Sequence, residues 1–335
     1  MKKYVNLFVF VFMIGACLSQ GRAQTKSAVS YKNPVVDIAM PDPTVIKAAD
    51  GYFYVYATES TRNVPIMKSK DLVEWTYCNT AFTNKTRPRF EPKAGIWAPD
   101  INYINGKYVL YYAMSVWGGE QTCGIGVATA NSPQGPFTDH GKMFRSNEIG
   151  VQNSIDPSLL QYEGRNYLVW GSFRGIYVIE LTADGLSIMP GAKKKRIAGT
   201  AFEAVYIHKY GDYYYMFASI GSCCQGVKST YKVVVGRSKK VWGPYKDKTG
   251  KPMLKNGYSL VIGANNHFVG NGHGSQIIRD DAGQDWLLYH GFSRSTPENG
   301  RILLLDQIKW DQEGWPYVEG GSPSYETQKA PVFNN

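Results

Sequence analysis

The sequence has few charged residues and few cysteines, and it has no helical periodicity of any length. Charged residues make up 19% of the 335 residues, whereas hydrophobic residues make up 43% and aromatic residues 14%. This balance argues against a disordered chain, because it provides enough apolar side chains to bury a large core. We therefore expect a globular protein of one or two domains.

Cysteine is scarce, and its pattern indicates neither a zinc site nor a thiol nucleophile. No two cysteines have the CxxC spacing, and nothing around them resembles a nucleophile paired with its base. An oxidising compartment permits disulfides, but four cysteines allow three connectivities and the sequence does not choose among them. The four that follow the N-terminal segment are Cys78, Cys123, Cys223 and Cys224.

The N-terminus is typical of an export signal. Leu7 to Ala16 is apolar, follows two lysines and is too short to cross a bilayer as a helix. Two cleavage sites compete, because residues 14–17 resemble a lipoprotein box while residues 21–23 fit an ordinary signal peptidase. We expect residues 1–23 to be a signal peptide, with no transmembrane span. The product is periplasmic, extracellular or a cell-surface lipoprotein anchored at Cys17.

Positive charge exceeds negative charge without forming a basic tail. The formal net charge is +10, and it falls to +7 if cleavage after Ala23 removes two lysines and one arginine. The one dense basic run, residues 193–196, has no interleaved aromatic residues, which argues against nucleic-acid binding. We interpret the run as a solvated loop, with an acidic pectic substrate or an anionic surface as the alternative.

One strand pattern occurs five times along the chain. Each copy is a glycine followed by alternating aromatic and aliphatic residues, which suits a half-buried β-strand. Successive glycines are 55, 58, 47 and 72 residues apart, which fits one four-stranded blade of a β-propeller per copy. The five glycines are Gly51, Gly106, Gly164, Gly211 and Gly283.

These repeats predict an all-β, five-bladed β-propeller over residues 33–320, followed by a tail of residues 321–335. A short strand precedes each glycine strand and another follows it. We favour a propeller over a sandwich, because radial repetition leaves only short, protected edges. We expect it to be a monomer. The predicted downstream strands are Val64 to Lys68, Ile125 to Thr129, Ile176 to Leu181, Val233 to Arg237 and Ile302 to Ile308.

The strand before each glycine carries one ionisable residue. Because the innermost strands of a propeller line its central channel, we expect these five side chains to meet there. A turn explains any single Asp before a proline, but five ionisable groups in one channel would be costly unless a site uses them. The five are Asp42, Asp100, Asp156, Glu203 and His273.

Clustered carboxyl groups suit the cleavage of glycosidic bonds. Such a cluster can raise the pKa of one carboxyl while another stays ionised, and glycoside hydrolysis needs one carboxylic acid and one carboxylate. Aromatic residues at the channel mouth would stack on sugar rings, although ordinary packing explains any one of them. Candidates are Trp97, Trp117 and Phe173.

These motifs resemble glycoside hydrolase family 43, a family of five-bladed propellers, across residues 33–320. The resemblance implies an inverting hydrolase in which Asp42 is the general base, Glu203 is the general acid and Asp156 tunes the pKa of the acid. The acid motif departs from the family, because Val205 stands where proline is usual.

Within the family the chain looks most like arabinan-degrading members, on residues 95–101, 170–176 and 223–231. That resemblance implies α-1,5-linked arabinan as the substrate and a cation, usually calcium, held near His273 largely through waters. A calcium ion also agrees with an oxygen-rich set of ligands. We expect substrate contacts from Trp97, Asp100, Asn153, Ser172, Phe173 and Arg301.

Other functions remain open at this stage. Residues 299–301 resemble exo-acting branches of the family, so endo and exo action, and arabinan and xylan-type substrates, are alternatives. Pro41 stands where arabinan-cutting relatives often have histidine. A retaining fructan hydrolase is disfavoured, because its usual signature around the first Asp is missing. A sugar-binding propeller without catalysis is the alternative from another class.

Overall fold

The computed structural model describes Met1 and residues 29–334. The predicted signal peptide and the lipoprotein site at Cys17 therefore lie outside the described residues. Within residues 29–334, no helix is long and apolar enough to cross a bilayer. The only α-helix in this part of the chain is α1 (Ser146–Ile149).

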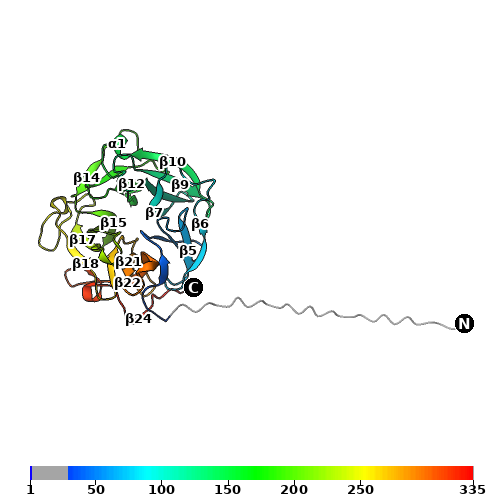
Figure 1. Cartoon of the computed structure of the whole chain (residues 1–335), viewed down its shortest axis with the longest axis vertical. Coiled ribbons are helices and arrows are strands. Elements are labelled where there is room, and N and C mark those ends of the chain that lie inside the picture. Colours follow the sequence, from blue (N-terminus) through cyan, green and yellow to red (C-terminus); the bar gives the residue numbers. More distant parts are fainter. Residues whose placement is uncertain (2–28, 335) are drawn as a thin grey trace.

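Five antiparallel sheets stand radially around one axis, so the predicted five-bladed propeller is confirmed (Figure 1). The first four blades each have four strands in chain order, from the axis outwards. Blade 1 contains β3 (Thr44–Lys47), β4 (Phe53–Tyr56), β5 (Pro65–Ser69) and β6 (Thr76–Thr80). Blade 2 contains β7 (Gly95–Ile104), β8 (Lys107–Ser115), β9 (Gly124–Ala130) and β10 (Thr138–Arg145). Blade 3 contains β11 (Ser158–Tyr162), β12 (Arg165–Trp170), β13 (Ile176–Glu180) and β14 (Lys195–Ala198). Blade 4 contains β15 (Glu203–Tyr210), β16 (Tyr213–Ile220), β17 (Lys232–Ser238) and β18 (Ser259–Ile262).

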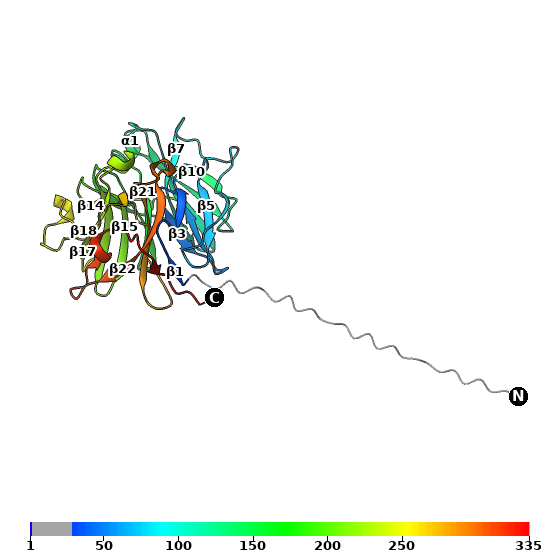
Figure 2. The same cartoon turned by 60° about the horizontal axis from the view of Figure 1, so that its bottom comes forward.

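Blade 5 closes the ring with strands from both ends of the chain. Its order is β19-β21-β22-β2, so the outermost strand comes from the N-terminal side. A separate two-stranded sheet pairs β1, the first described strand, with β24, and Figure 2 shows β1 beside the C-terminus. The strands are β19 (Phe268–Gly272), β20 (Ile278–Arg279), β21 (Asp285–Ser293), β22 (Ile302–Trp310), β23 (Pro316–Tyr317), β2 (Val36–Ala39), β1 (Ser30–Tyr31) and β24 (Gln328–Lys329).

Residues 321–334 pack against the propeller. The ring of Phe333 lies 4.6 Å from that of Phe53 in blade 1, and the Val332 amide donates to the buried Asp280 carboxylate. This segment therefore helps to close the ring between blades 5 and 1.

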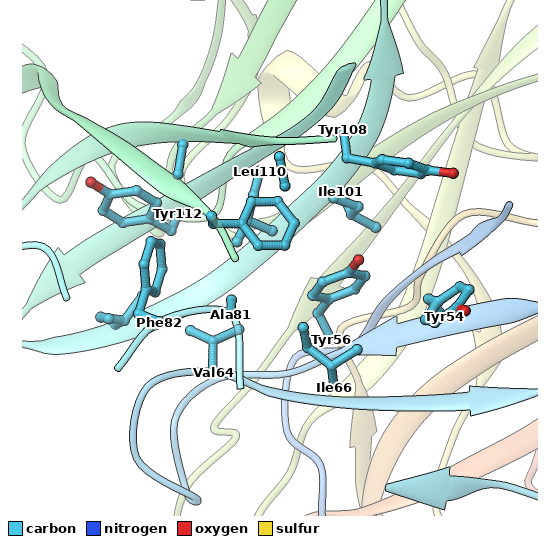
Figure 3. Close-up of a cluster of buried hydrophobic side chains, with 14 of the residues drawn as sticks. Tyr54, Tyr56, Val64, Ile66, Ala81, Phe82, Ile101, Tyr108, Leu110 and Tyr112 are labelled. Atoms are coloured by element: carbon cyan, nitrogen blue, oxygen red, sulfur yellow. The ribbon is translucent and has the colours of Figure 1, made fainter. Parts of the chain in front are cut away.

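The core is divided into five large clusters, each between two neighbouring blades. Strand β4 is an example of this division, because Tyr54 and Tyr56 face blade 2 whereas Phe53 and Val55 face blade 5. Side chains alternate between the two faces of a strand, and both faces are covered, so the repeat strands are apolar throughout. Figure 3 shows the cluster between blades 1 and 2. All five repeat glycines have positive φ, between 54° and 82°, in the turn that leads into the second strand.

Candidate active site

At the axis, each blade has one residue in the left-handed backbone region, in or next to its innermost strand. This conformation is uncommon for residues other than glycine, and strained positions of this kind cluster at functional sites. We call these five residues the upper layer. They are Asp42 (φ 53°), Ala98 (φ 43°), Asp156 (φ 56°), Ala204 (φ 53°) and His273 (φ 51°).

A lower layer follows two residues further along each innermost strand. Its members make backbone hydrogen bonds to the second strand of the blade, and all five line a small cavity of about 20 Å³ inside the channel. That volume holds a water molecule but no sugar. The lower layer is Thr44, Asp100, Ser158, Tyr206 and Ser275.

A cleft of about 730 Å³ opens at the upper layer. Asp42, Asp156 and His273 line it, and so does Glu203, which directly precedes an upper-layer residue. Four of the five ionisable residues that the sequence assigned to the channel therefore meet in one cleft. Of the residues expected to contact substrate, five also line it: Trp97, Asn153, Ser172, Phe173 and Arg301.

Asp100 does not line this cleft, so its expected contact with substrate stays a prediction. It belongs to the lower layer, because the left-handed residue of blade 2 is Ala98. Its carboxylate accepts hydrogen bonds from the Leu159 amide at 2.7 Å, Asn102 at 2.6 Å and Gln276 at 2.9 Å. Burial raises the pKa of Asp100 to about 7, since these partners carry no positive charge.

Asp42 is surrounded by groups that keep it ionised. Arg301 Nη1 donates to its Oδ1 at 2.7 Å, Thr58 Oγ1 donates to its Oδ2 at 2.6 Å, and His273 Nδ1 lies 3.2 Å from Oδ1. Burial opposes ionisation of Asp42, but Arg301 and His273 outweigh it and hold its pKa well below the usual range. A carboxylate in this state can accept a proton from water.

Glu203 has the opposite electrostatic environment. Burial and the negative charge of Asp42 raise its pKa, although hydroxyls of Ser172 and Tyr231 oppose the rise. Ser172 Oγ donates to Glu203 Oε2 at 2.6 Å. Asn153 Nδ2 in turn donates to Ser172 Oγ at 2.9 Å and orients it. Glu203 is thus prepared to donate a proton.

Asp156 contacts the backbone next to the acid Glu203. Its Oδ2 accepts a hydrogen bond from the Ala204 amide at 3.1 Å, directly beside Glu203. Burial raises the pKa of Asp156, and the charges of Glu203 and Asp42 add to the rise, while His273 opposes it. Burial disfavours the charged form of His273, but the carboxylates of Asp42, Asp156 and Glu203 raise its pKa.

The mouth of the cleft presents aromatic rings and a disulfide. The rings of Trp97 and Trp117 lie 5.5 Å apart, and Trp117 is 78% exposed. Cys223 and Cys224 form a disulfide between adjacent residues on the blade 4 side of the cleft. This settles the connectivity that the sequence left open, and it leaves Cys78 and Cys123 unpaired.

Three residues at this site were missed by the sequence reasoning: Thr58, Tyr231 and His290. For His290 a signal existed, because it ends the fifth repeat strand where the other four copies have alanine or glycine. Its Nδ1 accepts a hydrogen bond from the Asp42 amide at 3.0 Å. Burial lowers the pKa of His290, so this imidazole is neutral and its 3.3 Å approach to the Asp42 carboxylate is no ion pair.

A cation near His273 would depend on waters for most of its ligands. Among residues 29–334, no three His, Cys, Asp or Glu side chains converge as a metal cage. The cavity below His273 is lined by oxygen-bearing side chains, including Asp100, Ser158 and Gln276. These donors fit a hard cation such as calcium.

A sequence profile of the glycosyl hydrolases family 43 matches residues 31–316. The chain belongs to glycoside hydrolase family 43. Two relatives are each 36% identical to it: the extracellular exo-α-(1→5)-L-arabinofuranosidase ArbA of Cellvibrio japonicus and the extracellular endo-α-(1→5)-L-arabinanase 1 of Bacillus subtilis. The first alignment covers 83% of this chain and 86% of the relative, and the second covers 82% and 86%.

Solved structures agree with this assignment. The α-L-arabinanase of Cellvibrio cellulosa in complex with arabinohexaose has a TM-score of 0.76 and 33% identity, over 85% of this chain and 96% of that one. The family 43 endo-arabinanase of Bacillus licheniformis has a TM-score of 0.73 and 31% identity, over 86% and 99%. The protein is therefore a glycoside hydrolase of an inverting family.

Proposed function

We propose that this enzyme hydrolyses α-1,5-linked L-arabinofuranose units in arabinan, with Glu203 as general acid and Asp42 as general base. The observation that carries this proposal is the opposite pKa shift of the two carboxyl groups in one cleft. Inverting hydrolysis needs such a division, with one neutral carboxylic acid and one carboxylate.

The reaction proceeds in one displacement. Glu203 transfers its proton to the glycosidic oxygen as the bond from that oxygen to the anomeric carbon breaks. Asp42 removes a proton from a water molecule, whose oxygen attacks the anomeric carbon from the opposite face. Arg301 and Thr58 hold Asp42 ionised and oriented through their hydrogen bonds. Asp156 interacts electrostatically with Glu203, so that ionisation of either carboxyl raises the pKa of the other, and its hydrogen bond to the Ala204 amide fixes the backbone beside the acid.

The substrate assignment rests on the relatives and on the shape of the cleft. Both relatives at 36% identity are named for α-(1→5)-arabinan linkages, and the Cellvibrio cellulosa structure contains arabinohexaose. A cleft of about 730 Å³ with Trp117 exposed at its mouth suits an oligosaccharide. We propose cleavage within the chain. Release of arabinose from a chain end is the second candidate, because one of the two relatives is exo-acting and Arg301 contacts the general base, Asp42.

A calcium ion fits where the cleft meets the channel, because His273 lines both the cleft and the small cavity below it. His273 would hold the ion together with waters on the cleft side, and lower-layer oxygens such as those of Asp100 and Ser158 would face it from below. Bound there, the ion would supply positive charge that offsets the carboxylates. We also propose that the enzyme is exported and acts as a monomer, either in soluble form or anchored through Cys17, since both relatives are named extracellular.

The test is product analysis on defined substrates. The mature protein is incubated with linear arabinan, branched arabinan, xylan and aryl pentosides, and the products are separated by size. Short oligosaccharides from linear arabinan support endo action, and arabinose alone supports exo action. Xylose from xylo-oligosaccharides with every arabinan intact would replace arabinan by a xylan-type substrate. Binding of arabinan without cleavage, equal in wild type and Glu203→Gln, would indicate a sugar-binding propeller.

A further inference from the structure

We propose that Tyr231 is a positioning residue that links the acid Glu203 to the base Asp42. Tyr231 lies between the loop that carries the Cys223–Cys224 disulfide and strand β17, and it is 1% exposed. It lines the cleft, and its backbone amide donates to the Ser222 carbonyl at 3.1 Å. This inference rests on the proposed acid role of Glu203.

Tyr231 and Glu203 line the same cleft, and the hydroxyl of Tyr231 acts on the Glu203 carboxyl as a donor that lowers the pKa of the acid. Burial and the charge of Glu203 raise the pKa of Tyr231 well above its usual value, so the phenol remains a donor. Together with Ser172 it gives the acid two hydroxyl partners. Both stabilise the carboxylate that remains after Glu203 has given up its proton.

The ring of Tyr231 stacks on His290, with centroids 5.6 Å apart and planes 13° from parallel. His290 is fully buried in β21, and its Nδ1 accepts the hydrogen bond from the Asp42 amide. One rigid pair of rings therefore joins the carboxyl that donates the proton to the backbone that carries the base. Inversion requires these two carboxyl groups to keep a fixed separation that leaves room for water.

Gly272 shows that the position of the Tyr231 ring is closely constrained. A Cβ at residue 272 would lie 2.1 Å from Cδ1 of the ring, so no side chain fits there while the ring keeps its place. Ordinary core packing would also bury a tyrosine, but it would not require a hydroxyl on the acid. The hydroxyl and the ring can therefore be tested separately.

The decisive variant is Tyr231→Phe, which keeps the ring stack and removes only the hydroxyl. Tyr289→Phe is the matched control, because Tyr289 is equally buried and its hydroxyl donates to a carboxylate, Asp306, outside the cleft. Both variants and the wild type are assayed on linear arabinan and on an aryl arabinofuranoside with a good leaving group. Thermal unfolding of all three reports the loss of stability.

We expect Tyr231→Phe to lower kcat on arabinan about 10- to 100-fold, which is less than the roughly 10²- to 10⁴-fold that a general acid itself contributes, because Glu203 is still present. The loss on the aryl substrate should be much smaller, because a good leaving group needs little proton donation. Removal of the donor raises the pKa of Glu203, so the high-pH limb of kcat should move to higher pH. Tyr289→Phe should show neither effect.

Equal losses on both substrates with an unmoved pH limb would overturn the inference and leave Tyr231 as a core residue. Gly272→Ala gives a second check, because it displaces the ring and leaves the hydroxyl in the chain. It should lower kcat more than it raises KM, and an unchanged kcat in a folded variant would count against the inference. A wild type that cleaves neither substrate would instead reject the proposed function.

Discussion

The upper and lower layers of the channel contain the same residue type, aspartate, in two different environments. Asp42 has an arginine and a histidine as partners and stays ionised beside an open cleft. Asp100, in the lower layer, has two amide side chains and one backbone amide as partners, and its pKa rises to about 7. Cationic partners therefore keep a buried carboxylate ionised as a base, whereas three neutral donors leave a buried carboxyl as a structural support.

The difference arises because lower-layer residues lie two positions further along the chain than upper-layer residues. Each blade has one left-handed residue in or next to its innermost strand, and a carboxyl at that position or directly before it faces the cleft. A carboxyl two residues later faces a cavity large enough for one water molecule. The comparison makes distinct predictions for the two layers.

The largest expected effect is in the cleft. Glu203→Gln and Asp42→Asn should each lower kcat on linear arabinan by about 10³-fold or more, since each removes one partner of the acid–base pair. Asp100→Asn is the matched control, because it makes the same chemical change in the lower layer, and it should keep at least about a tenth of the wild-type kcat. An Asp100→Asn enzyme as inactive as Glu203→Gln would break the distinction between layers.

The next effect concerns the cation that keeps Asp42 ionised. Arg301→Met removes the positive charge 2.7 Å from Oδ1, so the pKa of Asp42 should rise towards its usual value. Because the base must be ionised, activity at low pH should be lost, and the acidic limb of kcat/KM should move to higher pH. We expect a loss of about 10- to 100-fold at pH 5 and less at pH 7.

Arg301→Lys is the control for this experiment. It retains the charge while losing the planar guanidinium, so any role of Arg301 in binding sugar should raise KM in both variants. The acidic limb should move only in Arg301→Met. A limb that stays in place in both would show that Arg301 does not set the ionisation of Asp42.

The sequence predicted the fold well, because five glycine turns and apolar strands depend on local patterns. The downstream strand predicted at Val233 to Arg237, for example, lies within β17. The sequence also brought together Asp42, Asp156, Glu203 and His273, since each lies in or next to the innermost strand of its blade.

The sequence failed where the backbone conformation matters. Counting back from a glycine does not reveal that Ala98, and not Asp100, occupies the left-handed position. Tyr231 could not be found in this way, because a tyrosine beside a strand is an ordinary core residue in a chain with 24 of them. Its contacts with Glu203 and His290 come from different blades and exist only in three dimensions.

A cation bound between the layers should stabilise the folded protein. At a calcium concentration about 100 times Kd, linkage gives about 2.7 kcal/mol, which is a rise in Tm of several degrees. Removal of metal with a chelator should lower Tm by that amount, and added calcium should restore it. His273→Ala should abolish the calcium-dependent shift. If metal analysis finds no bound ion and Tm does not respond, His273 serves only as a partner of Asp42.

The smallest expected effect is the pH dependence of stability due to Asp100, measured in chelator. Its pKa is raised from 3.8 to about 7 in the folded protein, so the folded state binds a proton that the unfolded state has released between these values. Its stabilising contribution is thus complete below pH 3.8 and is lost as pH rises through about 7. Asp100→Asn cannot titrate and lacks this loss.

Asn at position 100 also replaces one acceptor oxygen by a donor, which should cost about 1 kcal/mol or more at every pH, because three donors point at the carboxylate. At pH 5 the variant should therefore melt below the wild type. Between pH 5 and pH 8 the difference in Tm between wild type and variant should narrow or reverse, because only the wild type must then bury a charge. A gap of constant size across this range would mean that Asp100 is already ionised at pH 5, and the contrast between the layers would then lie in their contacts alone.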